Sequence, residues 1–441
     1  MVTLPQITGA LRRSRTSTVA RNVVSNYATV VWMSGLSFAF VPIYVRNLGP
    51  VEWGVVAACV TLQGFLALLD VGLGQIMPRS FARVAGNARE EAALFRAYSR
   101  IYTVLALSGF VAGELCAGPA AQYWFRSPGI DSGHLRMALH LIPVQFLFQF
   151  ANNAHLGLWY GLQLQRKANL RTCVFGTARQ LAALSSVLLY SRTAFVYLVP
   201  FVLVSGIEWA SNRHALLASY RGTDDGGQSA DVRAILRDTG PFAVAVIAGL
   251  LLSQADRFVL SATQDLTQYG YYVIVANVGL AFTSLHTPLM RAYFPRIARD
   301  DALGHQGRAT SFGMLFWAVL LLCVLPLLIV IIYAPALLFL WLRNPAIARA
   351  GTLPFRLILA SVAVNSIYNV IYQRLLSRDA GRTVIAINVA GLVAVSITAL
   401  VVGHRIGIAL GGLMWLVGSV TQLALGLLWL RYRARAALKV A

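Results

Sequence analysis

Long runs of predominantly apolar residues recur along nearly the whole chain, separated by short polar breaks that carry arginine. An α-helix needs roughly 20 such residues to cross a bilayer. The pattern therefore predicts an all-α polytopic membrane protein without a separate soluble domain. The expected spans, about twelve, cover residues 23–45, 53–76, 98–119, 136–160, 172–190, 194–217, 239–261, 269–292, 311–335, 352–373, 383–402 and 407–430.

Composition and charge agree with a membrane location. Of the 441 residues, 58% are hydrophobic and 12% are charged, whereas soluble domains carry about 25% charged residues. The net charge of +21 would suit nucleic acid, but its distribution argues against that partner. If the spans alternate from a cytoplasmic N-terminus, 27 Lys and Arg lie on the cytoplasmic side, 8 on the outer side and 2 within spans. This bias predicts that both termini are cytoplasmic.

Cysteine placement gives no indication of a metal or of any other cofactor. The four cysteines lie in apolar segments and lack the spacing of metal ligands. We expect all four to be small buried hydrophobic residues. They are Cys59, Cys116, Cys173 and Cys323.

The two halves of the chain share a spaced pattern. Gly54 follows an aromatic residue at the start of one apolar span, and Gly270 does the same 216 residues later. Arg83 and Arg299, which follow these spans, have the same separation. This match and a second one, at nearly the same spacing, together predict a duplicated transporter. The second match, at a spacing of 212 residues, joins Asn153, Tyr160, Arg166 and Ala168 to Asn365, Tyr372, Arg378 and Ala380.

The duplication divides the spans into two sets of six. Because an even number of spans separates corresponding helices, these helices cross the membrane in the same direction. We expect an N-terminal six-helix bundle over residues 1–217, a cytoplasmic linker over 218–238 and a C-terminal six-helix bundle over 239–441. Two parallel bundles of this kind should surround a central cavity.

The sequence also resembles a known family over essentially its entire length. The family is the polysaccharide-transporter branch of the multidrug/oligosaccharidyl-lipid/polysaccharide flippase superfamily. Length, helix number and the two-bundle duplication fit this branch. The residues that carry the resemblance are RNLG at 46–49, EWG at 52–54, LQG at 62–64 and LLDVGLG at 68–74, with SQADRFVL at 253–260 and YGYY at 269–272 in the second half.

The resemblance implies a flippase rather than an enzyme. Such proteins move undecaprenyl-diphosphate-linked oligosaccharide units, such as O-antigen or exopolysaccharide repeats, from the inner to the outer leaflet of the bacterial cytoplasmic (inner) membrane by alternating access. The implied partners are the lipid-linked oligosaccharide, membrane lipids and other polysaccharide-assembly proteins. No bound cofactor is implied, and coupling to H⁺ or Na⁺ is compatible with the family.

Two polar stripes are candidates to line the route of the sugar. Amide side chains offer directional donors and acceptors to hydroxyl groups without the cost of a buried charge. The same side chains also form hydrogen bonds between membrane helices, so either role explains them. The stripes are Gln145, Gln149, Asn152 and Asn153 on the span 136–160, and Ser361, Asn365, Asn369, Tyr372 and Gln373 on the span 352–373 or at its edge.

Arg179 and Glu208 lie within consecutive spans. At about 1.5 Å per residue they sit roughly 10 and 13 Å from the cytoplasmic ends, so we expect them to meet. One interpretation is an ion pair that stabilises the N-terminal bundle. The other makes Arg179 a contact for the diphosphate, because a guanidinium matches phosphate oxygens. Glu208 would then hold Arg179 until substrate competes, or would exchange a proton.

Three further charged residues complete the candidate set. Asp256 and Arg257 are adjacent in the outer part of the span 239–261, inside a motif of the resemblance. Because neighbouring helical residues point about 100° apart, we expect them to face different neighbours. Arg21, at the cytoplasmic end of the first span, suits either a diphosphate contact or a topology anchor.

Two other function classes remain open at this stage. A cation-coupled multidrug exporter of the same superfamily should favour acidic cavities, whereas the charges here are mixed. A membrane polysaccharide polymerase or ligase needs acid–base or substrate-binding residues outside the membrane, often on a large loop. The longest outer segments, near 120–135 and 336–351, are poor in acidic residues and histidine.

Overall fold

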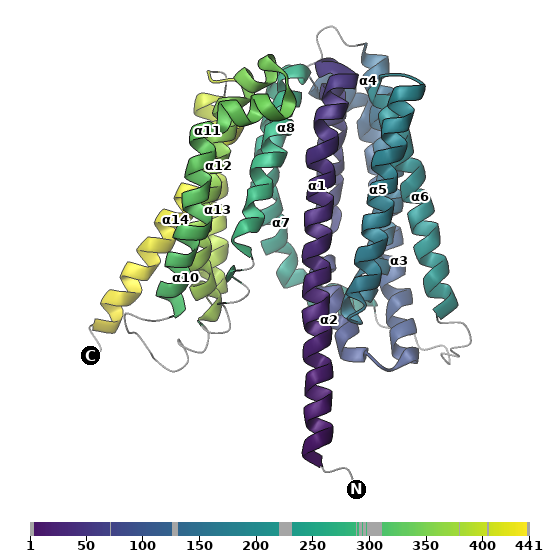
Figure 1. Ribbon diagram of the computed structural model, residues 1–441, viewed down its shortest axis with the longest axis vertical. Coiled ribbons are helices and arrows are strands. Elements are labelled where there is room, and N and C mark those ends of the chain that lie inside the picture. Colours follow the sequence, from purple (N-terminus) through teal and green to yellow (C-terminus); the bar gives the residue numbers. More distant parts are fainter. Residues whose placement is uncertain are drawn as a thin grey trace. The chain divides into compact units, whose positions relative to one another are not determined.

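The computed structural model describes residues 4–70, 72–125, 131–219, 232–287, 289, 290, 293, 297, 311–378, 380–403 and 405–438. Side chains at 4–20, 23, 75, 234, 236, 238–248 and 433–438 lie outside this description. Within the described residues the structure is helical and contains no β-strand (Figure 1). The expectation of an all-α membrane protein is therefore confirmed.

Long helices dominate the described chain. They are α1 (Leu4–Leu66), α2 (Leu73–Val84), α3 (Ala88–Pro119), α4 (Ser132–Gly161), α5 (Gln165–Leu189), α6 (Ala194–Ser219), α7 (Val232–Thr263), α8 (Leu266–Ala281), α10 (Ser311–Val319), α11 (Leu325–Leu342), α12 (Pro345–Ser377), α13 (Gly381–Val402) and α14 (Ala409–Leu438). Short 3₁₀ turns lie at η1 (Ala67–Asp70) and η3 (Phe282–Leu285), and π-helical turns at η2 (Ala120–Trp124) and η4 (Leu320–Val324).

The first two predicted spans lie on α1, which is not regular throughout. Gly49 interrupts it with φ 79° and ψ 171°, outside the helical region. Glycine adopts a positive φ without the steric cost that a Cβ atom brings. The change of direction between the two spans is therefore placed at a residue that tolerates it.

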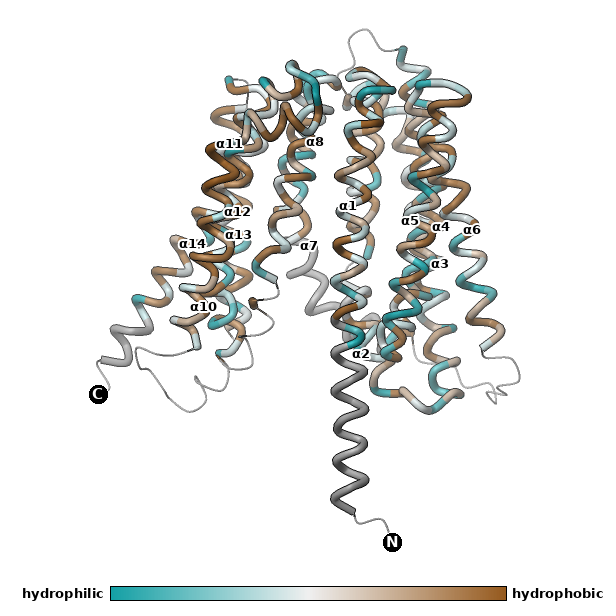
Figure 2. Tube along the Cα trace, in the orientation of Figure 1, coloured by the Kyte–Doolittle hydropathy of each residue, from teal (hydrophilic) through white to brown (hydrophobic). Residues whose placement is uncertain are grey.

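Some predicted spans are more clearly hydrophobic than others. Eight helical stretches in the described residues are long and apolar enough to cross a membrane, and one of them, Val24–Asp70, holds two predicted spans. Figure 2 shows α11 as hydrophobic along most of its length, whereas polar positions interrupt α5. The helix α8 has only 16 residues before it passes into η3. Polar interruptions and short helices are common where a membrane protein carries its transport route.

Chain contacts divide the protein into two compact units, and two short segments of the first half belong to the second unit. The predicted linker at 218–238 lies largely outside the described residues, so the division at that place stays a prediction. The N-terminal unit comprises Met1–Leu48, Leu62–Ala121 and Gly133–Ala243, and the C-terminal unit comprises Gly49–Thr61, Gln122–Ser132 and Val244–Ala441.

Polar contacts join α1 to α5 within the N-terminal unit. The Asn169 side chain donates to Asn26 Oδ1 at 2.6 Å, and the Trp32 indole donates to Thr177 Oγ1 at 2.9 Å. The other face of α5 packs against α6. In the C-terminal unit, α12 packs against α8, α11 and α14. Each unit therefore contains one helix, α5 or α12, that contacts several other helices of the same unit.

The helices that contain the repeat-related glycines Gly54 and Gly270 end alike. The stretch after Gly54 passes into η1, and the stretch after Gly270 passes into η3. The first residues of these 3₁₀ turns, Ala67 and Phe282, are separated by one residue less than the two glycines. A helix that tightens at the same place in both halves supports the internal duplication.

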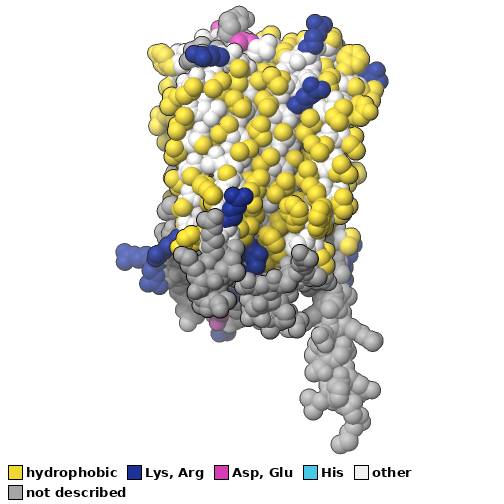
Figure 3. Space-filling model, turned by 90° about the vertical axis from the view of Figure 1, so that its left-hand side faces the viewer, with side chains coloured by type: hydrophobic (Ala, Val, Ile, Leu, Met, Phe, Trp, Pro, Cys, Tyr) yellow, Lys and Arg dark blue, Asp and Glu magenta, His cyan; other side chains and the backbone are white. Residues whose placement is uncertain are grey.

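The described surface suits lipid. The face in Figure 3, which belongs to the helices on the left of Figure 1, carries hydrophobic side chains across its middle and arginine or lysine toward both ends. A lipid-facing surface also explains why the expectation that all four cysteines are buried was wrong. Cys59 and Cys323 are buried, but Cys173 is only partly buried and Cys116 is exposed. An apolar side chain on a membrane helix meets lipid as readily as a protein core.

Candidate transport sites

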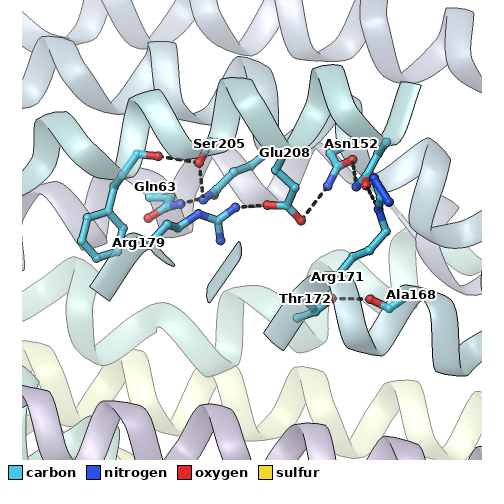
Figure 4. A network of polar contacts seen from close by, with 11 residues as sticks. Gln63, Asn152, Ala168, Arg171, Thr172, Arg179, Ser205 and Glu208 are labelled. Carbon is cyan, nitrogen blue, oxygen red and sulfur yellow. Dashed lines mark hydrogen bonds and ion pairs between the residues drawn. The ribbon is translucent and has the colours of Figure 1, made fainter. Parts of the chain in front are cut away.

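The ion pair expected between consecutive helices is present. Arg179 on α5 and Glu208 on α6 form a direct salt bridge. Their side chains are 18% and 6% exposed, so the pair is shielded by protein. Figure 4 shows Glu208 between Arg179 and Asn152. Charged groups at this depth need partners, and each of these two supplies one for the other.

The pair extends through amides toward a second arginine. Asn152 of α4 donates to Glu208 Oε1 at 3.2 Å and accepts from Asn212 Nδ2 at 2.8 Å. Arg171 Nε donates to Asn212 Oδ1 at 2.5 Å, and its Nη2 donates to Ser211 Oγ at 2.6 Å. One carboxylate is thus linked to two guanidinium groups, one directly and one through amides.

One aromatic ring supports the Arg171 end of this network. The Arg171 guanidinium lies 5.5 Å from the centre of the Trp159 ring, and Lys167 Nζ lies 4.9 Å from it. Trp159 itself is buried. An aromatic face attracts cations and fixes their position. The sequence had placed Arg171 only among the cytoplasmic charges, and its spacing of eight residues before Arg179, close to two helical turns, was the signal for one shared face.

A second set of hydrogen bonds, between uncharged side chains, lies beside this network (Figure 4). Gln63 donates to Gln149 Oε1 at 2.7 Å, and Gln149 donates to Ser205 Oγ at 3.2 Å. Among the predicted lining residues, Gln149 therefore lies beside the charged network and bonds to Gln63 and Ser205. Asn153 is partly buried and makes no hydrogen bond with the described residues. Gln63, Ser205 and Asn212 were not among the predicted site residues, because single polar residues on separate spans form no pattern.

Asn152 should matter more for stability than its neighbour Asn153. The variant Asn152→Leu removes one donor to Glu208 and leaves the buried Asn212 Nδ2 without its acceptor, and such a loss typically costs about 1–3 kcal/mol. Asn153→Leu is the matched control, since it changes the same residue type one position away. We expect a clearly lower melting temperature in detergent for Asn152→Leu than for Asn153→Leu. Equal melting temperatures would contradict a structural role for the network.

A cavity lies inside the C-terminal unit, between α7, α12, α13 and α14, with a volume of about 190 Å³. Asp256 lines it and is 1% exposed. The polar residues that share its wall are Ser253, Asn365, Asn388, Trp415, Ser419 and Gln422. Four helices thus bring an acid, amides and hydroxyls to one pocket.

The Asp256 carboxylate is only half satisfied. The Tyr272 hydroxyl of α8 donates to Oδ2, while Oδ1 has no hydrogen-bond partner among the described residues. The indole N–H of Trp415, which lines the same cavity, approaches this carboxylate but forms no hydrogen bond of good geometry with the described residues. A buried unsatisfied carboxylate is costly and usually marks a place for water, an ion or a proton. The geometry therefore suits the binding of a small cation or a proton.

Arg257 corrects one expectation from the sequence. Its Nη2 donates to Asn277 Oδ1 at 2.6 Å, and Asn277 lies on α8, as does the partner of Asp256. The expectation that the two cannot share a neighbour was wrong, because both bond to α8, although of the two only Asp256 lines the cavity. Tyr272 and Asn277 are five residues apart on α8, so one helix presents a partner to each side chain. Arg257 lies at a more exposed position than Asp256.

The stripe on α12 is split between two environments. Asn365 donates to Gln422 Oε1 at 3.4 Å and lines the cavity of Asp256. Asn369 donates to Asn365 Oδ1 at 2.8 Å. Tyr372 instead packs against a hydrophobic cluster that includes Ile371. Asn365 thus shares the cavity with Asp256 and is bonded to Asn369, whereas Tyr372 takes part in hydrophobic packing.

Arg21 lies apart from these networks in the N-terminal unit. It is exposed and lies two residues before the first predicted span. The next residue, Asn22, is buried and donates to Gln163 Oε1 at 3.2 Å. That contact fixes this turn of α1 against the connection between α4 and α5. It leaves Arg21 directed to the surroundings of the protein.

Comparison with known proteins shows which family and which solved structures this chain is similar to. A family model described as polysaccharide biosynthesis protein matches residues 19–300. Comparison with curated protein sequences found no match. Three solved structures illustrate the similarity of the fold: the lipid II flippase MurJ in an inward closed conformation (TM-score 0.71, 10% identity, 93% of this chain and 87% of that chain), an inward-facing multidrug resistance MATE family transporter (0.65, 14%, 95% and 96%), and a mutant of the Vibrio cholerae MATE transporter VcmN (0.60, 14%, 97% and 99%).

These likenesses show that the fold is that of the multidrug/oligosaccharidyl-lipid/polysaccharide flippase superfamily, as the sequence resemblance had implied. Identities of 10–14% support the fold alone. The family match is more specific and extends over well more than half of the residues. The chain is therefore a multi-pass membrane protein that belongs to the polysaccharide biosynthesis protein family.

Proposed function

We propose that the protein is a flippase for undecaprenyl-diphosphate-linked oligosaccharides, which it moves from the inner to the outer leaflet by alternating access. The observation that carries the proposal is the network of the N-terminal unit, in which Arg179 and Arg171 converge on one carboxylate amid amides. The family match to polysaccharide biosynthesis supports the same substrate class.

The chemistry of such a substrate fits the network. Its lipid tail can stay in the bilayer, while the diphosphate and the sugars need a protein-lined route. The Arg179 side chain is held by Glu208 and its Nε has no hydrogen-bond partner among the described residues. A diphosphate offers several anionic oxygens and can compete with one carboxylate for a guanidinium fork. Gln149 and Asn152 supply neutral groups that suit sugar hydroxyls.

Glu208 gives this site two states. With Glu208 bound, the charge of Arg179 is neutralised. When the diphosphate takes Arg179, the carboxylate retains Asn152 and, through Asn212, the link to Arg171. A buried acid that loses its cation is strongly disfavoured as an anion, so it then tends to take up a proton. Binding and protonation of the N-terminal unit would be linked in this way.

Coupling to an ion gradient is assigned to Asp256. A half-satisfied buried carboxylate beside a small polar cavity is suited to take up H⁺ or Na⁺. Because the hydroxyl of Tyr272 on α8 contacts the same carboxylate, occupancy of the site would change how α7 and α8 are held together. We propose that this change biases the protein between its two access states.

The cellular setting follows from the same proposal. A lipid carrier of this kind would be met in the bacterial cytoplasmic (inner) membrane. The charge distribution supports cytoplasmic termini. Other proteins of polysaccharide assembly would deliver the lipid-linked unit at the inner face and accept it at the outer face.

Deletion of the gene, combined with tracking of radiolabelled lipid-linked sugars, tests the proposed function. We expect the lipid-linked unit to accumulate in the inner leaflet. Normal export with altered resistance to cationic dyes would instead favour a multidrug exporter. Accumulation of unpolymerised units in the outer leaflet would indicate a polymerase or ligase. Either of these two results would overturn the flippase assignment.

A further inference from the structure

Three polar side chains of α3 and α4 form a row of hydrogen bonds in the N-terminal unit. His140 Nδ1 lies 2.5 Å from Glu114 Oε2, and Arg136 Nε donates to His140 Nε2 at 3.4 Å. Because His140 Nε2 accepts a hydrogen bond, Nδ1 carries the proton and donates to Glu114, so the imidazole is neutral. The Arg136–His140–Glu114 cluster thus holds one cation and one anion, joined through an uncharged ring.

The cluster lies on a face of α3 and α4 that is open to lipid. Glu114 shares a face of α3 with Val111 and Leu107, three and seven residues before it, and both apolar side chains are exposed. On α4, the side chain of Met137 is exposed as well. The side chains of Glu114 and His140 are 30% and 35% exposed. Apolar side chains left uncovered along a membrane helix mark its lipid side, so the cluster faces lipid.

The depth of the cluster suits contact with lipid headgroups. Arg136 is the first residue of the span 136–160, and Glu114 lies five residues before the end of the span 98–119. At about 1.5 Å per residue, Glu114 is roughly 8 Å from the outer end of its span. Long charged side chains this close to the interface extend toward the headgroups. In the predicted orientation, the nearest headgroups belong to the outer leaflet.

Both charged groups keep atoms available for a ligand. Among the described residues, Arg136 forms no hydrogen bond besides that of Nε, and Glu114 forms none besides the contact of Oε2 with His140. The two terminal guanidinium nitrogens and Glu114 Oε1 are therefore open to the surroundings. Charged groups at membrane depth usually point into protein or water and find partners there, whereas these face lipid. A partner supplied by the lipid itself resolves this cost.

We propose that the Arg136–His140–Glu114 cluster binds the headgroup of one phosphatidylethanolamine molecule of the outer leaflet. The Arg136 guanidinium contacts the phosphate, and Glu114 accepts a hydrogen bond from the ammonium group. The imidazole ring separates the two charges, as the two-carbon link of ethanolamine separates the ammonium group from the phosphate. The site does not depend on the proposed cargo.

The same chemistry disfavours other common headgroups. Glu114 repels a headgroup that carries only negative charge, such as that of phosphatidylglycerol. A choline headgroup has the charges of ethanolamine but no N–H group, so it cannot donate a hydrogen bond to Glu114. The mixed charge of the cluster therefore selects a zwitterionic headgroup with a primary ammonium group.

Native mass spectrometry of the full chain in detergent measures this selectivity. The purified protein is mixed with phosphatidylethanolamine, phosphatidylcholine or phosphatidylglycerol of identical acyl chains, and the apparent dissociation constant of the first bound lipid is determined. We expect phosphatidylethanolamine to bind about ten-fold more tightly than either of the other lipids, as one additional charge-assisted hydrogen bond implies. Equal binding of all three lipids by the parent chain would overturn the proposal.

Two variants test the roles of the two charges. Glu114→Gln should lose most of the preference over phosphatidylcholine and should bind phosphatidylglycerol more tightly than the parent does. Arg136→Gln should weaken the binding of all three lipids, because each of them carries a phosphate, and Arg136→Lys should restore part of it. Arg192→Gln is the matched control, since Arg192 is an exposed arginine between α5 and α6, on the same side of the membrane in the predicted orientation. It should keep the parental preference.

The remaining outcomes exclude other occupants of the cluster. Parental lipid preference in both Glu114→Gln and Arg136→Gln, with parental melting temperatures, would show that the lipid binds elsewhere. Soluble phosphoethanolamine should not displace the bound lipid, and full displacement at equal concentration would point to a free phosphate compound instead. A dimer of the parent chain that both variants lose would show that a second copy covers the cluster. Each of these three results would overturn the proposal.

Discussion

Replacement of Arg179 by alanine is expected to reduce transport by about ten-fold or more and to lower the melting temperature. Removing one partner of a buried ion pair leaves the other charge uncompensated and typically costs about 3–5 kcal/mol. Arg179→Lys keeps the charge but not the planar fork, so we expect partial transport and a smaller loss of stability. Flipping in proteoliposomes and thermal unfolding in detergent measure the two effects.

A double variant separates substrate binding from structure. In Arg179→Gln combined with Glu208→Gln, neither charge remains, and two amides can bond to each other. We expect its melting temperature to recover toward the parent value, because no unpaired charge is left. Transport should stay low, because the diphosphate loses its guanidinium contact. Parental transport by the stable double variant would show that Arg179 is only a structural partner of Glu208.

The second large effect is expected for Asp256→Asn. Asparagine can still accept the hydrogen bond from Tyr272, so the variant should fold, but its side chain can neither bind a proton in the relevant range nor carry the charge that holds a cation. We expect transport to fall by about ten-fold or more and to lose its response to an imposed H⁺ or Na⁺ gradient. Flipping measured across vesicles with and without each gradient checks this.

Asp265 offers a matched control for this substitution. Its side chain caps the start of α8 by accepting from the Gln268 N–H at 3.3 Å, and asparagine caps helices equally well. Asp265→Asn should therefore leave both the rate and the gradient response unchanged. A full gradient response in Asp256→Asn would contradict the coupling role of that carboxylate.

The sequence predicted the architecture well because lipid imposes strict rules on it. Every backbone group must be paired inside the bilayer, so span-length apolar runs translate into helices. The meeting of Arg179 and Glu208 was predictable for a similar reason. Consecutive helices joined by a short loop lie side by side. Side chains of opposite charge at the same depth in the membrane then form a pair.

Residues at the edges of the spans were harder to interpret. Arg171 was counted as one cytoplasmic charge among many, yet it is bonded to Asn212 and Ser211 and lies by the Trp159 ring. A positive-inside count treats all arginines near a span end alike and cannot tell an anchor from a network member. Its spacing from Arg179 was the only indication in the sequence.

Tertiary contacts explain the other differences. Asp256 and Arg257 both reach α8, because the long arginine side chain escapes the angular rule for neighbouring helical residues. The packing of Gly49–Thr61 in the C-terminal unit has no signature in hydropathy. The internal repeat of the sequence makes Gly54 and Gly270 equivalent, but only the structure shows that the two glycines meet.

Reconstitution of the purified protein tests the central claim most directly. Proteoliposomes would carry a polyprenyl-diphosphate-linked oligosaccharide in the inner leaflet, and an added lectin or glycosidase would measure its arrival outside. Empty liposomes and Arg179→Ala protein serve as controls. We predict protein-dependent arrival that Arg179→Ala strongly reduces. Arrival at the rate of empty liposomes, together with active efflux of a cationic dye by the same preparation, would contradict the flippase.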